Sequence, residues 1–123
     1  MSPVTTDSKA LIVEYFEALS GQPKTEELLS RYITDPSLKD HIRQAEGAFP
    51  RYEVIAHQMI AEGDLVAVRC AFRGVQKGEF AGIPSTGREI SSDFMIIYRV
   101  VDGMIAEHWI QMNAPEIVHQ LTA

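Results

Sequence analysis

Apolar and polar residues follow two different periods along this chain, and the change falls near residue 50. Before it, apolar residues recur every three or four positions, which is the spacing of a helix with one buried face. After it, stretches rich in β-branched and aromatic residues alternate in polarity, which is the pattern of strands. Helices followed by antiparallel strands predict an α+β fold, in which a twisted sheet curls around the helices and encloses an apolar interior.

Four helices are expected, and each begins at a residue suited to capping a helix N-terminus. The first should end at Ser20-Gly21, and the last should run from Pro115 to Leu121. On the third, His41 shares a face with apolar residues, so it is the first polar side chain expected to point toward the interior. The capping candidates are Thr5, Thr6 or Asp7 for the first helix, Thr25 for the second, Asp35 or Ser37 for the third and Asn113 for the last.

The first of two expected hairpins joins Tyr52 to Ile60 with Leu65 to Phe72 through a two-residue turn at Glu62 and Gly63. One face of this hairpin is apolar except for His57. This pattern favours a core histidine that stays neutral, because burial penalises the imidazolium. The face holds Ile55, His57, Met59, Val66, Val68, Cys70 and Phe72.

The second hairpin turns at Asp102-Gly103, a strong two-residue turn signal that pairs Val101 with Met104. A bulge at the turn would shift the cross-strand pairs by one residue and mix the two faces. Neither face is uniformly polar, so we expect helices to cover one face and a second subunit, in a homodimer, to cover the other. Without a bulge, one face carries Ser92, Phe94, Ile96, Tyr98, Glu107, Trp109, Gln111 and Asn113, and the other carries Asp93, Met95, Ile97, Arg99, Ala106, His108, Ile110 and Met112.

Composition excludes several classes of function. The length and the absence of a linker predict a single domain over residues 1–123. The formal net charge is −6 and the basic residues are scattered, which argues against binding to nucleic acid or an anionic membrane. A lone cysteine, Cys70, with no signal peptide or membrane span, fits the reducing cytoplasm. The histidines are dispersed and no cofactor motif is present, so neither a metal nor a cofactor is expected.

The stretch from Gly74 to Asn113 carries the strongest motifs. Gly-Glu-Phe-Ala-Gly-Ile-Pro-Ser-Thr-Gly-Arg at residues 78–88, followed by Tyr-Arg-Val-Val-Asp-Gly-Met-Ile-Ala-Glu-His-Trp at 98–109, resembles the SnoaL-like polyketide cyclase family of the NTF2-like superfamily. The resemblance implies an NTF2-like cone, a strongly curved antiparallel sheet covered by N-terminal helices, with an internal pocket. Such pockets are the default sites for small, mostly apolar ligands.

Two positions depart from the family pattern. Gln76 stands where the family usually has a histidine, two residues after the glycine that Gly74 matches. Asn113 stands where the family usually has the aspartate that serves as the acid and base of the cyclases. An amide can hold a carbonyl by hydrogen bonding but cannot exchange a proton near neutral pH. The cyclase mechanism therefore cannot be transferred unchanged.

His41 and Asn113 are the candidate catalytic residues. His41 could be a base or hydrogen-bond donor in the pocket, or a half-buried histidine bonded to a backbone carbonyl. Asn113 could hold a ligand or could only cap the last helix. Asp93 and Glu107 could supply the missing carboxylate, although strand carboxylates more often face solvent or pair with arginine.

The candidate substrate-binding residues include an apolar wall with one donor, a loop amide and two further polar groups; they are Trp109, Gln76, His57 and Tyr98. Trp109 could equally be a core residue, and Gln76 a solvated loop residue. In an enzyme of the cyclase or isomerase type, His41 would abstract a proton next to a carbonyl of a hydrophobic metabolite, and amide and indole donors would hold the enolate oxygen. Two alternatives remain open: a non-catalytic binding protein for an apolar metabolite, and a dimerising structural module.

Overall fold

The computed structural model describes residues 4–123, with side chains from Ser8 onward. The four strands form one antiparallel sheet in the order β1-β2-β3-β4. The α+β class predicted from the sequence is confirmed. The elements are α1 (Val4–Leu19), α2 (Glu26–Tyr32), α3 (Pro36–Ala48), β1 (Glu53–Glu62), β2 (Leu65–Val75), β3 (Glu89–Val101), β4 (Met104–Met112) and α4 (Ala114–Thr122).

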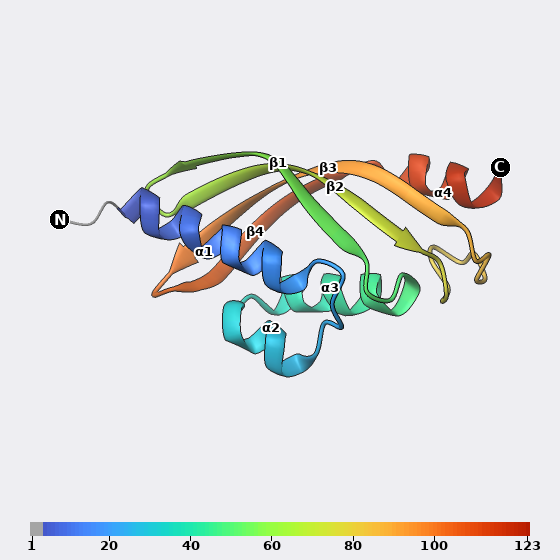
Figure 1. Cartoon of the computed structure of the whole chain (residues 1–123), viewed down its shortest axis with the longest axis horizontal. Coiled ribbons are helices and arrows are strands. Elements are labelled where there is room, and N and C mark those ends of the chain that lie inside the picture. Colours follow the sequence, from blue (N-terminus) through green and yellow to red (C-terminus); the bar gives the residue numbers. More distant parts are fainter. Residues whose placement is uncertain (1–3) are drawn as a thin grey trace.

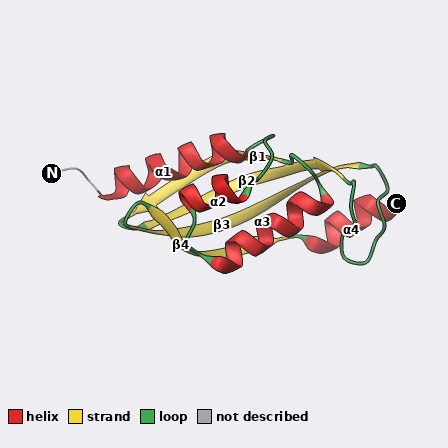
Figure 2. Cartoon of the chain, turned by 90° about the horizontal axis from the view of Figure 1, so that it is seen from below, coloured by secondary structure: helices red, strands yellow, loops and turns green. Residues whose placement is uncertain are grey.

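The sheet is strongly curved, and α1, α2 and α3 lie on its concave side, while α4 lies near the opposite end from the N-terminus (Figure 1). Seen from the helical side, these helices lie over the strands (Figure 2). α1 turns Ile12, Tyr15, Phe16 and Leu19 toward the sheet, and all four side chains are buried. The rings of Tyr15 and Tyr98 meet edge to face, with centroids 5.8 Å apart, which anchors α1 on β3.

Three of the four predicted caps are confirmed. The side chains of Thr25, Asp35 and Asn113 accept hydrogen bonds from the first backbone N–H groups of α2, α3 and α4. The prediction for the first helix is wrong, because α1 begins at Val4 and continues through the cap candidates at positions 5–7, whose side chains lie outside the described part of the chain. A cap contributes only about 1 kcal/mol, so it does not by itself stop a helix. No helix within residues 4–123 is long and apolar enough to cross a membrane.

The first hairpin differs from the prediction in two ways. Glu62 pairs with Leu65, so the turn residues are Gly63 and Asp64. A bulge at His57 places one extra residue in β1, between the pairs that Ala56 and Gln58 make with β2. The bulge reverses the alternation of β1, so Ile55 and His57 are exposed instead of facing the core. The expectation of a core histidine at position 57 is therefore wrong.

The second hairpin turns at Asp102-Gly103 and pairs Val101 with Met104, as predicted. Both turn residues have positive φ, 51° and 74°, as a tight hairpin turn requires. A bulge follows, because Val100 pairs with Ile105 while Arg99 pairs with Glu107, and Ala106 is the extra residue. The concave face therefore combines Phe94, Ile96 and Tyr98 with His108, Ile110 and Met112, and the convex face combines Met95, Ile97 and Arg99 with Glu107, Trp109 and Gln111.

Candidate functional site

A cavity of about 640 Å³ lies between the concave face of the sheet and the helices α1 and α3. This volume lies within the range of about 300–1,000 Å³ that is usual for small-molecule sites. All five phenylalanines of the chain and three of its four tyrosines line it. The aromatic lining consists of Phe16, Phe49, Phe72, Phe80, Phe94, Tyr15, Tyr52 and Tyr98.

The tyrosines give this apolar cavity its few internal polar groups. Tyr15 and Tyr98 lie side by side in the lining, with their rings edge to face. Desolvation by burial is the largest influence on Tyr15, Tyr52 and Tyr98 and raises the pKa of all three. The phenols therefore stay protonated near neutral pH and can donate hydrogen bonds to a ligand.

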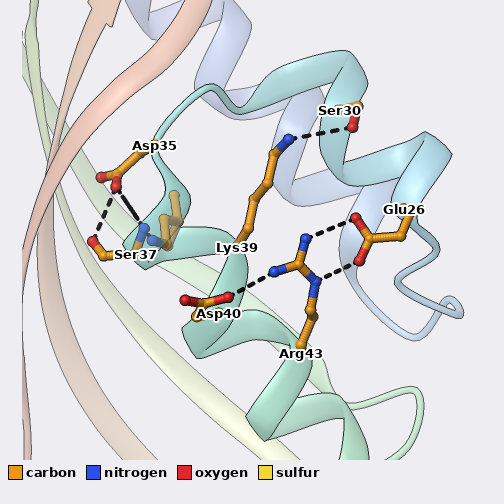
Figure 3. A network of polar contacts seen from close by, with 8 residues as sticks. Glu26, Ser30, Asp35, Ser37, Lys39, Asp40 and Arg43 are labelled. Atoms are coloured by element: carbon orange, nitrogen blue, oxygen red, sulfur yellow. Dashed lines mark hydrogen bonds and ion pairs between the residues drawn. The ribbon is translucent and has the colours of Figure 1, made fainter.

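The helix α3 forms one wall of the cavity and presents Leu38, His41, Ile42 and Ala45 to it. Arg43, on the same helix, binds Glu26 of α2 through two nitrogens, one of them 2.8 Å from the carboxylate, and binds Asp40 at 2.7 Å (Figure 3). Lys39 donates to Ser30 at 3.3 Å beside this pair (Figure 3). Exposed ion pairs contribute little stability one by one. Together they fix α3 against α2, which keeps His41 in place.

A chain of three titratable side chains reaches the cavity from the sheet. His108 Nδ1 lies 2.8 Å from Asp35 Oδ2, and His108 Nε2 lies 3.2 Å from His41 Nδ1. The side chains of His108 and Asp35 are only 5% and 10% exposed, whereas His41 is open and lines the cavity. The chain thus runs from a nearly buried carboxylate to an imidazole that a ligand can reach.

The segment between α2 and α3 explains why Asp35 meets His108. Ile33 makes a parallel bridge to Ile105 of β4. The backbone N–H groups of Thr34 and Asp35 both donate to Ile105 O, at 2.9 and 3.3 Å. This segment is therefore held along β4, with Asp35 beside the strand that carries His108.

Asp35 carries out two tasks with its two oxygens. Oδ1 accepts from Ser37 N, Ser37 Oγ and Leu38 N, which caps α3, and Oδ2 faces His108. Burial acts to raise the pKa of Asp35, but hydrogen bonds from His108, Ser37 and Leu38 outweigh it and lower the pKa below its usual value. The group is therefore a carboxylate near neutral pH.

The loop between β2 and β3 is built around Gln76. Its side chain is fully buried, with Nε2 donating to Gly78 O and Ile83 O at 3.0 and 2.9 Å. Its Oε1 accepts from Thr86 N and Thr86 Oγ1 at 2.9 and 2.7 Å. The amide thereby uses its whole hydrogen-bonding capacity within the loop and holds Phe80, three residues before Ile83, against the cavity. Gln76 is neither a ligand group in the cavity nor a solvated loop residue.

A buried lysine braces another wall. Lys24 Nζ donates to Tyr52 O at 2.6 Å, lies 3.5 Å from a carboxylate oxygen of Glu46 and stands 3.9 Å from the centre of the Tyr52 ring. Burial lowers the pKa of Lys24, and Glu46 opposes that shift. The lysine ties the end of α3 to the start of β1 and so fixes Tyr52 in the lining.

The predicted site residues separate into two groups. His41 and Tyr98 line the cavity, whereas Trp109, Gln76, His57 and Asn113 do not. Trp109 is 48% exposed on the convex face beside Arg99, because the bulge at Ala106 reverses β4. Asn113 is exposed and caps α4, accepting from Glu116 N at 3.1 Å.

The alternative carboxylates also lie away from the cavity. Asp93 is exposed on the convex face, and Glu107 accepts a hydrogen bond from Arg99 Nε at 2.8 Å. The sequence interpretation missed His108 as a site residue and saw Asp35 only as a cap. The bulge that it left open was the one signal that could have brought His108 to the concave face. Among the side chains from Ser8 onward, no group of three or more metal-ligating residues could hold a metal ion.

The fold is similar to those of several solved structures. AclR of Streptomyces galilaeus, provisionally called a hydroxylase, is 24% identical over 96% of this chain and 82% of its own, with a TM-score of 0.81. A provisional SnoaL-like polyketide cyclase of Jannaschia sp. CCS1 is 20% identical over 100% and 96% of the two chains, with a TM-score of 0.84.

A SnoaL-like polyketide cyclase of Agrobacterium tumefaciens is 17% identical over 98% and 99%, with a TM-score of 0.75. At these identities the structures show a shared fold. No curated protein matches the chain. The model of the SnoaL-like polyketide cyclase family matches residues 26–121, so the chain belongs to that family.

Proposed function

We propose that the cavity binds a hydrophobic, carbonyl-bearing metabolite and that the protein catalyses a cyclase- or isomerase-type reaction through proton abstraction next to the carbonyl. The observation that carries the proposal is the position of His41, which lines an aromatic cavity and is hydrogen-bonded to a second, nearly buried histidine. Imidazoles are the commonest general bases in enzymes, since their ordinary pKa lies near neutral pH.

In the proposed step, the C–H bond next to the carbonyl breaks and its proton bonds to His41 Nε2. The electron pair of that bond passes to the carbonyl oxygen, which becomes an enolate oxygen. The tyrosine hydroxyls in the lining take the role of oxyanion donors in place of Asn113, Trp109 and Gln76, which lie outside the cavity. Donors already placed in an apolar site can stabilise such an anion by roughly 3 kcal/mol each.

The test uses 2-tetralone, a fused-ring ketone with acidic hydrogens next to its carbonyl. In D₂O, the protein should accelerate loss of the α-proton signals in the ¹H NMR spectrum above the rate in buffer. His41→Gln should slow the exchange by about 10²-fold or more, because the amide cannot accept the proton. The matched control, His57→Gln, changes an exposed histidine outside the cavity and should leave the rate unchanged.

One observation favours a second candidate function, a binding protein that does not convert its ligand. By the resemblance, Asn113 stands where the family usually has its acid–base aspartate, and its amide caps a helix outside the cavity. Under this alternative, 2-tetralone would shift the NMR resonances of residues lining the cavity while its exchange rate stayed at the buffer value. That result would overturn the enzymatic proposal.

We also propose a homodimer formed through the convex face. Ile60, Ala67, Ile97 and Trp109 are register partners across all four strands, so they form one apolar row on this face. Ile60, Ile97 and Trp109 are 63%, 40% and 48% exposed in the single chain. Exposed apolar surface that extends across a whole sheet favours burial against another protein surface.

A further inference from the structure

We propose that Asp35 and His108 are positioning residues that set the tautomer of His41, so that its Nε2 is the basic atom facing the cavity. The proposal rests on the proposed function for its chemical consequence. The tautomers themselves can be observed without any substrate, because they are defined by which ring nitrogens carry protons. The geometry that carries it is the hydrogen-bonded chain from Asp35 Oδ2 through His108 to His41 Nδ1.

Asp35, as a carboxylate, can only accept hydrogen bonds. Its Oδ1 is already bonded to the backbone N–H groups of Ser37 and Leu38 and to the Ser37 hydroxyl. Its Oδ2 lies 2.8 Å from His108 Nδ1. His108 must therefore carry a proton on Nδ1, which in the neutral ring leaves Nε2 with a lone pair.

The lone pair on His108 Nε2 in turn fixes which nitrogen of His41 carries a proton. A lone pair on His108 Nε2, 3.2 Å from His41 Nδ1, forms a hydrogen bond only if His41 Nδ1 carries the proton. The neutral His41 ring then has its lone pair on Nε2. Each imidazole is thus held in one tautomer by the group behind it, as second-layer hydrogen bonds do for metal-bound histidines.

The same chain can receive the proton that His41 takes up. When a proton binds His41 Nε2, the proton on His41 Nδ1 can move to His108 Nε2. His41 is then neutral again and carries its proton on Nε2, and His108 becomes an imidazolium next to the Asp35 carboxylate. Because these two side chains are 5% and 10% exposed, the resulting charge pair lies largely out of water, where each charge needs its partner.

The substitution Asp35→Asn should exchange the protonated and unprotonated nitrogens of both rings. It keeps the helix cap, because asparagine caps helices as well as aspartate does. The Asn oxygen would continue to accept from Ser37 N and Leu38 N, which turns the amide NH₂ toward His108. His108 Nδ1 must then accept and its Nε2 must carry the proton. His41 Nδ1 becomes an acceptor in turn, and the proton of His41 moves to Nε2.

The experiment is a two-bond ¹H–¹⁵N correlation of the imidazole rings at about pH 8.5, two units above the ordinary histidine pKa of about 6.5. In the wild type, His41 and His108 should both show a protonated Nδ1 and an unprotonated Nε2. In Asp35→Asn the two nitrogens should exchange these signatures in both rings. Asp40→Asn, the same change on an exposed carboxylate of α3 that bonds Arg43, should leave both rings as in the wild type.

Protonated Nε2 atoms in the wild type, or unchanged rings in Asp35→Asn, would overturn the proposal. The wild-type spectrum decides the question even if the variant does not fold. With 2-tetralone, Asp35→Asn should lower the maximal exchange rate on the order of 10²-fold with little change in the concentration for half-saturation. If the wild type exchanged no protons but showed these tautomers, the enzymatic function would fail and the positioning role would stand.

Discussion

Replacing Gln76 by leucine tests whether the motif loop depends on one buried amide. The substitution removes four hydrogen bonds, two donated to Gly78 O and Ile83 O and two accepted from the N–H and hydroxyl of Thr86. Gly78 O and Thr86 N lose their partner, whereas Ile83 O still accepts from Phe80 N at 3.0 Å. Two buried polar groups left unpaired cost about 2–6 kcal/mol together, at about 1–3 kcal/mol each. Because Thr86 and other loop residues are exposed, water can reach part of the loop, so we take the lower part of this range and expect a loss of about 3 kcal/mol.

The assay is urea unfolding followed by circular dichroism at one protein concentration, since a dimer would make stability depend on concentration. With a slope of about 1.5 kcal/mol per molar urea, a loss of about 3 kcal/mol lowers the midpoint by about 2 M. The matched control is Gln120→Leu. Gln120 also bonds a strand backbone, at Ser91 N and Ser91 O, but at an exposed edge where water can replace the amide.

The control should cost no more than about 1 kcal/mol, the value of an ordinary hydrogen bond. If Gln76→Leu shifted the midpoint no more than Gln120→Leu, the loop would be held by its other contacts, and the reasoning would be refuted. A second measurement separates the effect on stability from the effect on the cavity lining. The loop supplies Phe80 to the cavity, so folded Gln76→Leu should also bind 2-tetralone more weakly, whereas Gln120→Leu should not.

Three further predictions concern other parts of the chain. Gly78→Ala should lose about 1–3 kcal/mol in urea unfolding, because a Cβ there would lie 2.3 Å from Gly47 O, and an unchanged midpoint would contradict the close approach. The pKa of Asp35 is lowered on folding, so the carboxylate stabilises the fold above its pKa in the unfolded chain, about 3.9, and this stabilisation is lost as the pH falls. The melting temperatures of the wild type and Asp35→Asn should therefore converge in acid, and a difference that does not change with pH would refute this. Ile97→Glu, at the centre of the exposed apolar row, should give a monomer in sedimentation velocity if the wild type is a dimer, and a dimeric variant would exclude this face.

Local signals were sufficient for three of the four helix caps and for one of the two hairpin turns. Thr25, Asp35 and Asn113 cap helices because a short polar side chain before an apolar helical pattern has few other stable arrangements. Asp102-Gly103 forms its turn because both positions must adopt positive φ, which this pair tolerates well. These caps and this turn depend on a few neighbouring residues, so they can be predicted from the local sequence.

The candidate site was harder to predict, because it depends on where strands gain a residue. Alternation predicts the faces of a strand only between bulges, and one extra residue reverses every later side chain. The bulge at Ala106 turned His108 to the concave face and Trp109 to the convex face, and the bulge at His57 exposed that histidine. Neither bulge has a strong local signature, since each is decided by the packing of the whole sheet.

Gln76 illustrates a different limit. A polar residue in a glycine-rich loop suggests either solvent exposure or ligand binding, and the sequence offered no reason to choose a third role. The structure buries it completely, because the loop folds back on itself and its inward-facing carbonyls and N–H groups need partners. The donors and the acceptor of the Gln76 amide match those groups, so its side chain supplies the hydrogen bonds that a neighbouring strand would supply in a sheet.

The resemblance puts Asn113 where the family usually has an aspartate, and the histidine chain offers other groups for proton transfer. Asn113 at the end of β4 can cap α4 but cannot move a proton, so any proton transfer must use other groups. The titratable groups at the cavity include Glu79 and also His41 on α3, behind which lie His108 on β4 and Asp35 before α3. The segment before α3 is bonded to Ile105, only three residues from His108, so the carboxylate is fixed to the same strand as the imidazole it orients. Under the proposed function, proton handling thus moves from the end of β4 to His41, which is bonded to His108 in the middle of β4, and the bulge at Ala106 is what turns His108 to the concave face.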